Sequence, residues 1–470
     1  MTDPHSGGGL LATLRRWAAS GGAMGENAWV RALADGRQWA DRSVMLGFAV
    51  ATGLVVVAFT LLAEAAAAAH QKLTGSSPWG PYAGLLWAPL LTVAVLAWTR
   101  RFAPGAQGSG IPQVVRALEP DLDEHQRGWL VSWRVSLHKV GLVSAGMLAG
   151  LSIGREGPTV QVGAGVMSQA RRWLSKDSGI DAHDLMVAGA AAGIAAAFNT
   201  PLGGIVFALE QLTRRRHMSH SALVITSIVA AGLVAVSVFG NETYFGRLRV
   251  QELGWSLLAP GVVVALACGL AGGLFARLLI VSMQGLPDRF SRWRQRFPLR
   301  FAAACAFAVA VIGLVTDGAT AGAGYATTRA LLEGGADPSA LYTLLKFVAT
   351  WLSAWTGVPA GVFAPSLAIG AGIGHDVASA WGLSREAAIP LIALGMAGFL
   401  AASTQGPITA FIIVMEMVSG HAMVLSLMAC ALLASGVSRL ITRPLYAELA
   451  AGLAVPSAPG GASPPTGGSR

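Results

Sequence analysis

The sequence predicts an all-helical protein that crosses a membrane many times. Only 12% of its 470 residues are charged and 54% are hydrophobic, whereas a soluble chain of this length needs far more surface charge. Three stretches rich in glycine and proline interrupt the apolar sequence, and the second part of the chain repeats the first. These observations predict an all-α polytopic membrane protein made of two related halves with broken helices.

The apolar segments are long enough to span a bilayer. A single span needs about 20 apolar residues, and fewer when the helix is broken or re-entrant. We therefore expect around ten or more membrane segments once the shorter ones are counted. The long, nearly uncharged runs are 43–63, 82–99, 222–239, 257–281, 301–315 and 421–437.

The basic residues indicate orientation rather than nucleic-acid binding. The net charge is +9, but arginines cluster at segment ends, before residue 43 and again after residue 99. The intervening loop 70–81 contains only Lys72. Because Lys and Arg gather on the cytoplasmic side, we expect a multi-pass protein of the cell inner membrane with a cytoplasmic N-terminus. Residues 1–42 contain no continuous apolar core, so no cleavable signal peptide is expected.

The cysteines Cys268, Cys305 and Cys430 lie in apolar runs without metal-ligand spacing, so we expect buried thiols and neither a metal nor a cofactor.

The chain divides into four parts. The tail is rich in Pro, Gly and Ser, which is typical of disorder. The predicted parts are a cytoplasmic N-terminal segment (1–42), a first membrane half (43–250), a second membrane half (251–450) and a disordered tail (451–470).

An internal repeat relates the two halves. The stretches 189–201 and 395–407 begin with glycines 206 residues apart (395 − 189) and end with prolines 206 apart (407 − 201). Glu210 and Glu416 keep the same spacing (416 − 210). Discontinuous helices at corresponding positions of two halves are typical of transporters that bind their substrate near the bilayer midplane.

The interrupting stretches 108–112, 154–158 and 361–365 each predict a helix start. Proline is tolerated at the first helical position because that N–H has no partner within the helix. Glycines before it let other groups approach the free N–H donors. Such helix ends are partly positive and attract anions. Several of them inside one membrane would make an anion site.

Glu156 is the candidate gate of that site. A carboxylate at membrane depth costs about 2.5–3.5 kcal/mol on insertion scales, and free N–H donors at a helix start stabilise its charge. The same donors would bind a free anion, so the carboxylate and the anion compete for one place. When protonated, the side chain can swing away, which makes it both a plug and a proton carrier. The alternative is a loop-exposed glutamate paired with Arg155.

Neutral donors complete the predicted site. The hydroxyl of Ser109 suits a site that must bind an anion and release it, although an isolated serine is more often a helix cap. Tyr446 offers a second hydroxyl, but its spacing alone predicts an interface tyrosine. Val362 and Phe363 offer backbone N–H groups, and Phe363 corresponds to Glu156 in the repeat.

These motifs together resemble the CLC family of chloride channels and chloride/proton exchangers. Gly-Ser-Gly-Ile-Pro, Gly-Arg-Glu-Gly-Pro and Gly-x-Phe-Ala-Pro occur in the family's order, and Pro-Leu-Tyr follows near the end. The resemblance covers about residues 43–449. It implies two inverted-topology halves of broken and tilted helices, and a homodimer with one pore within each subunit.

The resemblance also implies residue roles. Glu156 would be the external gate and proton acceptor. Gln211 occupies the position of the internal proton-relay carboxylate of bacterial exchangers and cannot titrate. The adjacent Glu210 is a poor substitute, because neighbours on a helix point about 100° apart. The implied anion-binding residues are Ser109, Gly110, Ile111, Arg155, Gly157, Val362, Phe363 and Tyr446.

Chloride/proton antiport gated by Glu156 is the leading functional hypothesis. A passive chloride channel, voltage-gated or not, is the close alternative because of Gln211. An intramembrane enzyme ranks lower, since no Ser–His pair or Asp pair accompanies the motifs. An organic-solute carrier also ranks lower, since no aromatic cage or paired charges suit a larger substrate. The expected partners are chloride, protons, membrane lipid and a second copy of the chain. Other charged residues are expected to snorkel or to pair with a neighbour: Glu64, His138, Lys139, Arg277, Lys346 and Glu416.

Overall fold

The computed structural model confirms an all-helical architecture. It describes residues 36–75, 77–213, 221–240, 245, 254–335, 339 and 341–456. Within these ranges the only extended pairing is an isolated bridge between Gly154 and Gly361. The predictions for residues 1–35 and for the tail beyond residue 456 lie outside the described residues.

The first half contains helices α2 to α10. Its first helix begins at Gly36, before the predicted span boundary at residue 43. Two elements in this half are single short turns, η1 (Pro104–Ala106) and η2 (Ser168–Arg172). The α-helices are α2 (Gly36–Gly75), α3 (Gly80–Phe102), α4 (Ile111–Ala117), α5 (Glu124–Leu130), α6 (Trp133–Leu148), α7 (Glu156–Met167), α8 (Ala182–Phe198), α9 (Pro201–Phe207) continued by the π-turn η3 (Ala208–Leu212), and α10 (Ser221–Phe239).

The second half contains helices α11 to α20. The short turns here are η4 (Trp255–Leu257) and η5 (His421–Met423). The α-helices are α11 (Leu258–Gln284), α12 (Arg289–Arg296), α13 (Pro298–Val315), α14 (Tyr325–Leu332), α15 (Tyr342–Trp355), α16 (Phe363–Ala380), α17 (Arg385–Thr404), α18 (Pro407–Met417), α19 (Val424–Arg439) and α20 (Leu445–Ala451).

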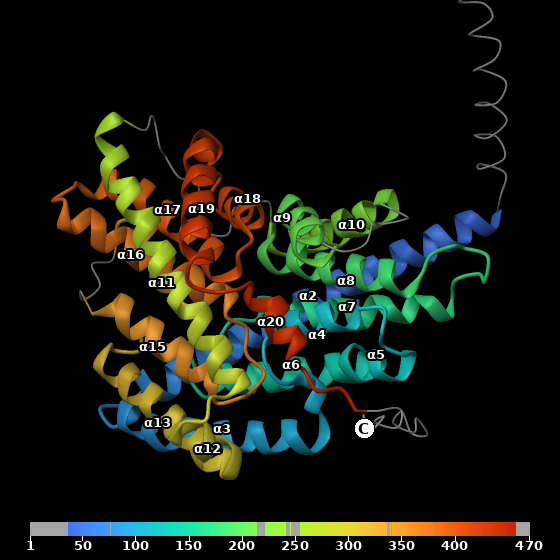
Figure 1. Cartoon of the computed structure of the whole chain (residues 1–470), viewed down its shortest axis with the longest axis horizontal. Coiled ribbons are helices and arrows are strands. Elements are labelled where there is room, and N and C mark those ends of the chain that lie inside the picture. Colours follow the sequence, from blue (N-terminus) through green and yellow to red (C-terminus); the bar gives the residue numbers. More distant parts are fainter. Residues whose placement is uncertain are drawn as a thin grey trace, which may run out of the picture.

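The repeat appears as matching helix pairs. Helices α7 to α10 lie on one side of Figure 1, α16 to α19 lie on the other, and α20 lies between them. Helices α7 and α8 touch where Gly163 faces the carbonyl of Gly189, and α16 and α17 touch where Gly370 faces the carbonyl of Gly395. A methyl group at any of these glycines would collide with backbone. The sequence repeat is therefore a repeat of close helix packing.

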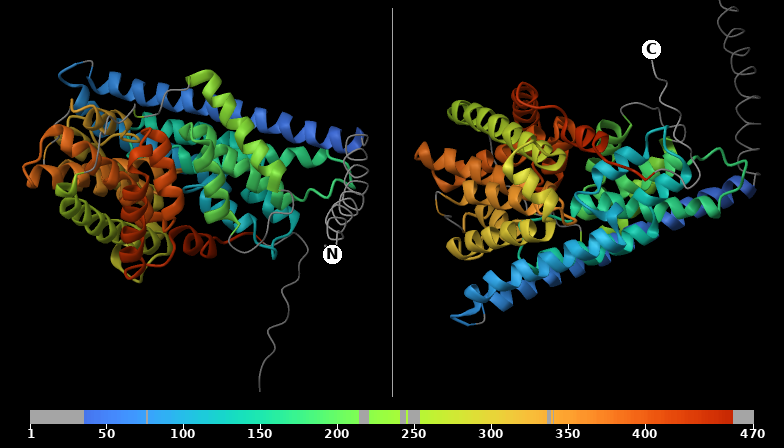
Figure 2. Two further views of the ribbon diagram at one scale, coloured as in Figure 1. Left: turned by 90° about the horizontal axis from the view of Figure 1, so that it is seen from above. Right: turned by 60° about the horizontal axis from the view of Figure 1, so that its bottom comes forward.

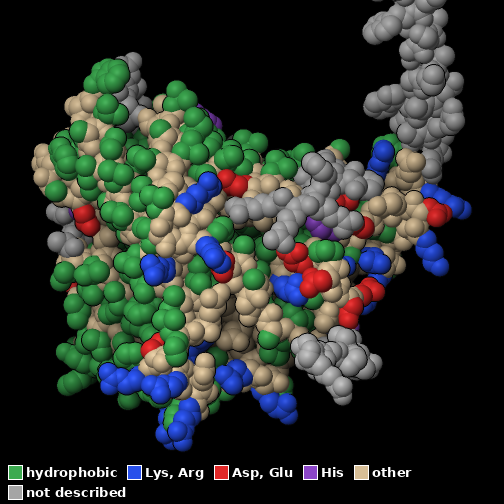
Figure 3. All heavy atoms as spheres, viewed as in Figure 1, with side chains coloured by type: hydrophobic (Ala, Val, Ile, Leu, Met, Phe, Trp, Pro, Cys, Tyr) green, Lys and Arg blue, Asp and Glu red, His purple; other side chains and the backbone are tan. Residues whose placement is uncertain are grey.

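Seven described helices are long and apolar enough to cross a membrane, which confirms the multi-pass prediction. The 40-residue helix α2 runs along much of the length of the molecule (Figure 2). Figure 3 shows hydrophobic side chains over much of the left part of the face, with Lys and Arg along its lower edge and also across its centre and right. This surface suits a protein that is embedded in lipid over most of its height.

All three predicted helix starts are present, with one correction. Helix α4 begins at Ile111, α7 at Glu156 and α16 at Phe363. The proline is the second residue of α4 and the third of α7 and α16, rather than the first. Every position in the first helical turn lacks an intrahelical N–H partner, so the proline is tolerated there for the predicted reason.

Candidate functional site

The starts of α7 and α16 meet near the boundary between the two halves. The N–H of Gly154 donates to the carbonyl of Gly361 over 2.7 Å, and the N–H of Gly361 donates back over 3.0 Å. A side chain at Gly361 would lie 2.7 Å from the Gly154 oxygen and 2.8 Å from the Cδ atom of Pro158. Glycine is therefore required for this approach, which brings two partly positive helix ends together.

The loop of residues 108–110, which we call the Ser109 loop, is hydrogen-bonded to the chain near the Gly154–Gly361 bridge. Gly108 and Gly110 adopt positive φ angles of 71° and 103°, which glycine tolerates at little cost. The carbonyl of Gly108 accepts hydrogen bonds from the N–H of Ala360 (3.1 Å) and from the Nζ atom of Lys139 (2.7 Å). The loop is thus fastened to the chain that leads into α16.

Close approach between the motifs extends to the α7 start. Gly157 is buried, and a side chain there would collide with the hydroxyl of Ser109. The N–H of Gly110 donates to the Oε1 atom of Gln113 over 2.9 Å, and Ile111 is fully buried. Val362 and Phe363 are buried at the start of α16. The structure therefore brings the predicted residues of three motifs into one buried region.

Two buried hydroxyls near these helix starts have no hydrogen-bond partner among the described residues. They are the Oγ atom of Ser109 and the phenolic oxygen of Tyr446. Tyr446 is 3% exposed and belongs to α20, which packs against α4. Its phenolic group lies within electrostatic reach of the Glu156 carboxylate. A buried polar group left unpaired costs about 1–3 kcal/mol, so both hydroxyls have donors that a ligand can use.

Glu156 is the first residue of α7 and is fully buried. The loop-exposed alternative is therefore wrong. Its Oε1 atom accepts a hydrogen bond from the hydroxyl of Tyr325 and lies 3.9 Å from the Nε atom of Arg155. Its Oε2 atom has no partner within the described structure. The carboxylate thus occupies the positive end of a helix, as an anion would.

A cavity of about 670 Å³ is lined by the two residues whose side chains approach the carboxylate, Tyr325 and Arg155. We call it the Tyr325 cavity, because Tyr325 lines it together with Arg155 and Glu64. An Nη1 atom of Arg155 lies 3.0 Å from the Oε1 atom of Glu64, and the guanidinium carbon lies 5.6 Å from the centre of the Tyr325 ring. Glu64 therefore pairs with a neighbour, as expected.

Tyr325 was not predicted from the sequence, yet a third repeated motif marks it. Residues 322–324 read Gly-Ala-Gly and lie 214 residues after the Gly-Ser-Gly of residues 108–110 (322 − 108). The glycines of the later motif also have positive φ angles, 61° and 87°. Tyr325 begins α14 just as Ile111 begins α4. The sequence therefore does contain a mark of this helix start, but it consists only of two glycines in a short loop.

Two lysines support these matching loops. Lys139 donates to the carbonyls of Ala106 (2.8 Å) and Gly108 (2.7 Å). Lys346, 207 residues later (346 − 139), donates to those of Thr320 (2.9 Å) and Gly322 (2.8 Å). Both lysines are 0% exposed, so of the two expected arrangements they pair with neighbouring groups and do not snorkel.

The side chains of Glu210 and Glu416 each extend from their own half of the molecule to a helix start in the other half. The carboxylate of Glu210 accepts from the N–H groups of Ile408 (3.0 Å) and Thr409 (2.8 Å) at the start of α18. The carboxylate of Glu416 accepts from the N–H groups of Leu202 (3.2 Å) and Gly203 (2.7 Å) at the start of α9. Each carboxylate therefore stabilises the helix start of the opposite half.

Gln211 lies next to this crossing. A side chain at Gly406 would collide with the Nε2 atom of Gln211, which has no hydrogen-bond partner among the described residues. Its neighbour Glu210 already uses both carboxylate oxygens on α18. Glu210 is thus engaged as a helix cap, which agrees with the expectation that it is a poor substitute for a relay carboxylate.

Potential metal ligands gather at the start of α8. Ligand atoms of Asp181, His183 and Asp184 lie within 4.8 Å of one another. Asp181 is the helix cap, accepting from the N–H of Asp184 over 2.8 Å. This local role accounts for the position of Asp181, and the absence of a metal remains a prediction.

Known proteins match the chain over most of its length. Residues 90–439 match the family model described as voltage gated chloride channel. The chain is 30% identical to the H(+)/Cl(-) exchange transporter ClcA of Cronobacter sakazakii, over 78% of this chain and 79% of that protein. It is also 30% identical to ClcA of Citrobacter koseri, over 85% of this chain and 86% of that protein.

Solved structures agree with the fold. The structure of a slow cyanobacterial Cl-/H+ antiporter gives a TM-score of 0.74 at 22% identity, covering 88% of this chain and 97% of that one. A CLC-type fluoride/proton antiporter gives a TM-score of 0.70 at 22% identity, covering 87% of this chain and 97% of that one. With the family model and the sequence relatives, these likenesses establish that the chain belongs to the voltage-gated chloride channel (CLC) family.

Proposed function

We propose that this protein exchanges chloride for protons across a membrane and that Glu156 is the gate shared by both ions. One observation carries the proposal: a fully buried carboxylate lies at a helix start that the unpaired hydroxyl of Ser109 approaches closely, and the Tyr446 hydroxyl is also buried and unpaired. Neutral donors replace the water around chloride without holding it too tightly for release. The protein therefore offers chloride a path that its own carboxylate can close.

The exchange follows from competition at the start of α7. Ionised Glu156 occupies the positive helix end and excludes a second anion from it. Protonation removes the charge, and chloride then takes the place that the carboxylate leaves. Return of the carboxylate requires loss of the proton and displacement of chloride. When the proton leaves on the side opposite to the one that receives the chloride, each cycle carries the two ions in opposite directions.

The anion meets backbone and hydroxyl donors along this path. Ser109 and Tyr446 supply their O–H groups, and Val362 and Phe363 supply N–H groups at the start of α16. Arg155 and Gly157 frame the position that the Glu156 carboxylate occupies. Gly110 and Ile111 fix the turn that presents Ser109.

Two relatives support this choice, because both are named as H(+)/Cl(-) exchange transporters. A passive chloride channel is the second candidate. It is favoured by Gln211, which cannot carry a proton, and by Glu210, whose carboxylate is engaged at α18. In an exchanger the proton must then reach Glu156 from the cytoplasm through water or another group.

The arginines before residue 43 and after residue 99 support a cytoplasmic N-terminus. With that orientation the C-terminal end of α2 and the Tyr325 cavity lie on the outer side, and Ser109 lies toward the inner side. We further propose that the protein acts in the cell inner membrane as a homodimer with one pore per subunit. It is a transporter and not an enzyme.

A flux assay tests the proposal. Purified protein in liposomes loaded with high chloride is diluted into low chloride, with chloride release and external pH recorded together. Exchange predicts that chloride efflux drives protons inward against their gradient. Chloride efflux without uphill proton movement would establish the passive channel instead. The absence of any chloride flux would contradict both candidates.

A further inference from the structure

We infer that Tyr325 is a positioning residue that latches the ionised carboxylate of Glu156 in its blocking position. This inference rests on the proposed function, because it concerns the same gate. The phenolic O–H of Tyr325 donates to the Oε1 atom of Glu156. A hydrogen bond to an ionised acceptor is roughly twice as strong as one between neutral groups. The latch therefore favours the closed, charged gate.

The hydroxyl is held in place by its surroundings. Tyr325 is the first residue of α14, directly after Gly324, whose φ angle is 87°. The ring centre lies 5.6 Å from the Arg155 guanidinium carbon and 5.8 Å from the ring centre of Phe245. Lys346 fastens the preceding loop through two carbonyls. Little rotamer freedom remains to be lost when the hydroxyl binds the carboxylate.

Tyr325 also separates the gate from the cavity. It lines the Tyr325 cavity, whereas Glu156 is fully buried. A carboxylate that moves toward this cavity must first break its bond with the Tyr325 hydroxyl. Protonation of Glu156 removes the charge that makes the bond strong. Release of the latch is thereby linked to arrival of a proton.

The latch comes from the opposite half of the molecule. Glu156 begins α7 in the first half, and Tyr325 begins α14 in the second half. Arg155 contacts both the Tyr325 ring and Glu64 of α2. Closure of the gate therefore also ties α14 to the first half, on the side of the Tyr325 cavity.

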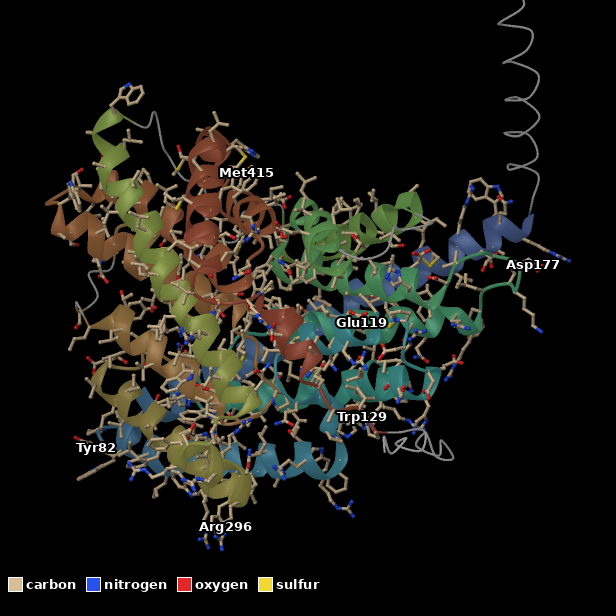
Figure 4. The ribbon with its side chains drawn as sticks, viewed as in Figure 1. Tyr82, Glu119, Trp129, Asp177, Arg296 and Met415 are labelled. Carbon is tan, nitrogen blue, oxygen red and sulfur yellow. The ribbon has the colours of Figure 1, made fainter. Side chains whose placement is uncertain are left out.

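The test is Tyr325→Phe, which keeps the ring and removes only the donor. Chloride turnover in liposomes should rise about tenfold, because the closed gate loses one charge-assisted hydrogen bond. Tyr82→Phe is the matched control: that tyrosine is 54% exposed and lies at the margin of the molecule (Figure 4). The control should transport chloride at the unmodified rate.

A double-mutant cycle separates a latch from a general structural effect. In a Glu156→Ala background there is no carboxylate to hold, so adding Tyr325→Phe should change chloride flux less than twofold. Chloride flux through the double variant would also show that the protein still folds without the Tyr325 hydroxyl. The inference is overturned if Tyr325→Phe alone matches or falls below the unmodified turnover. It is equally overturned if the acceleration persists in the Glu156→Ala background.

Failure of the latch differs from failure of the proposed function. If the unmodified protein moves no chloride, the proposed function is wrong. If it moves chloride and Tyr325→Phe does not accelerate it, only the latch is wrong. If the unmodified protein moves chloride without protons, the cycle still measures the latch through chloride flux alone.

Discussion

The starts of α7 and α16 share a backbone but differ in side chains. Both follow a glycine of the Gly154–Gly361 bridge, and both carry proline as the third helical residue. The first residue is Glu156 in α7 and Phe363 in α16. The proposed function uses this repeated backbone as two places where an anion binds. The side chain then decides which place can be closed by a proton-sensitive group and which stays open.

The two Gly-x-Gly loops differ in the same way. Each has two glycines at positive φ and is fastened by a buried lysine. The first loop presents the Ser109 hydroxyl, whereas the second has Ala323 in that position and places a hydroxyl on Tyr325 instead. The same loop backbone thus presents an unpaired hydroxyl in one half and precedes a hydrogen-bond donor to Glu156 in the other.

The largest effect is expected from removing the one carboxylate that distinguishes α7 from α16. Glu156→Ala should abolish chloride-driven proton movement while chloride flux persists, because both helix starts then lack a titratable group. Simultaneous chloride and pH recording in liposomes measures this. Glu386→Gln, a change at an exposed glutamate at the start of α17, should keep coupling intact. Coupled transport in Glu156→Ala would refute the assigned gate.

Loss of either supporting lysine should produce the next largest effect. Lys139→Met and Lys346→Met each remove the amine that donates to two carbonyls, which we expect to cost about 1–3 kcal/mol of stability. Thermal unfolding in detergent should show comparable decreases for the two variants. An unchanged unfolding temperature for one of them would show that the two loops are not equivalent.

Removing an unpaired hydroxyl should weaken chloride binding without affecting stability. Ser109→Ala and Tyr446→Phe should each lower chloride affinity about five- to tenfold, corresponding to about 1–1.4 kcal/mol for one hydrogen bond. Isothermal titration with chloride measures the affinity. Thr92→Val is the control, since the Thr92 hydroxyl on α3 is also buried and unpaired. Equal affinity in all three variants would exclude the hydroxyls as ligands.

Substitution of Glu210 or Glu416, whose carboxylates cap helix starts in the opposite halves, should have the smallest effect on stability. Glu210→Gln and Glu416→Gln each weaken a charge–dipole interaction at a helix start, which typically stabilises by about 0.3–1 kcal/mol. Unfolding experiments should give similar small losses for both, and proton transport should continue. If Glu210→Gln stopped proton transport, Glu210 would be a relay and not only a cap.

Much of this site could be predicted because its residues belong to short local sequence motifs. Glycine and proline around residues 110, 157 and 361 mark helix starts, and their constant spacing marks the repeat. Glu156 could be predicted because a carboxylate within an apolar sequence is costly unless a helix start stabilises its charge. The contacts of Lys139 and Lys346 could not be predicted, because hydropathy does not show whether a lysine amine extends to the membrane–water interface or donates to a buried backbone carbonyl.

Other features depend on how the halves come together. The crossed caps of Glu210 and Glu416 join residues 198 to 214 positions apart, which no local pattern reveals. Tyr325 was missed because the repeat pairs it with Ile111, a residue without a polar side chain. Its role appears only when the start of α14 is placed opposite the start of α7.

Anomalous scattering from bromide is the most direct test of the anion site. Crystals grown or soaked in bromide should show an anomalous peak within hydrogen-bonding reach of the Ser109 and Tyr446 hydroxyls and the N–H groups of Val362 and Phe363. A second peak should appear at the start of α7 in the Glu156→Ala variant, where the carboxylate no longer competes. Crystals of both proteins without a peak near Ser109 and Tyr446 would contradict the proposal that these helix starts bind an anion.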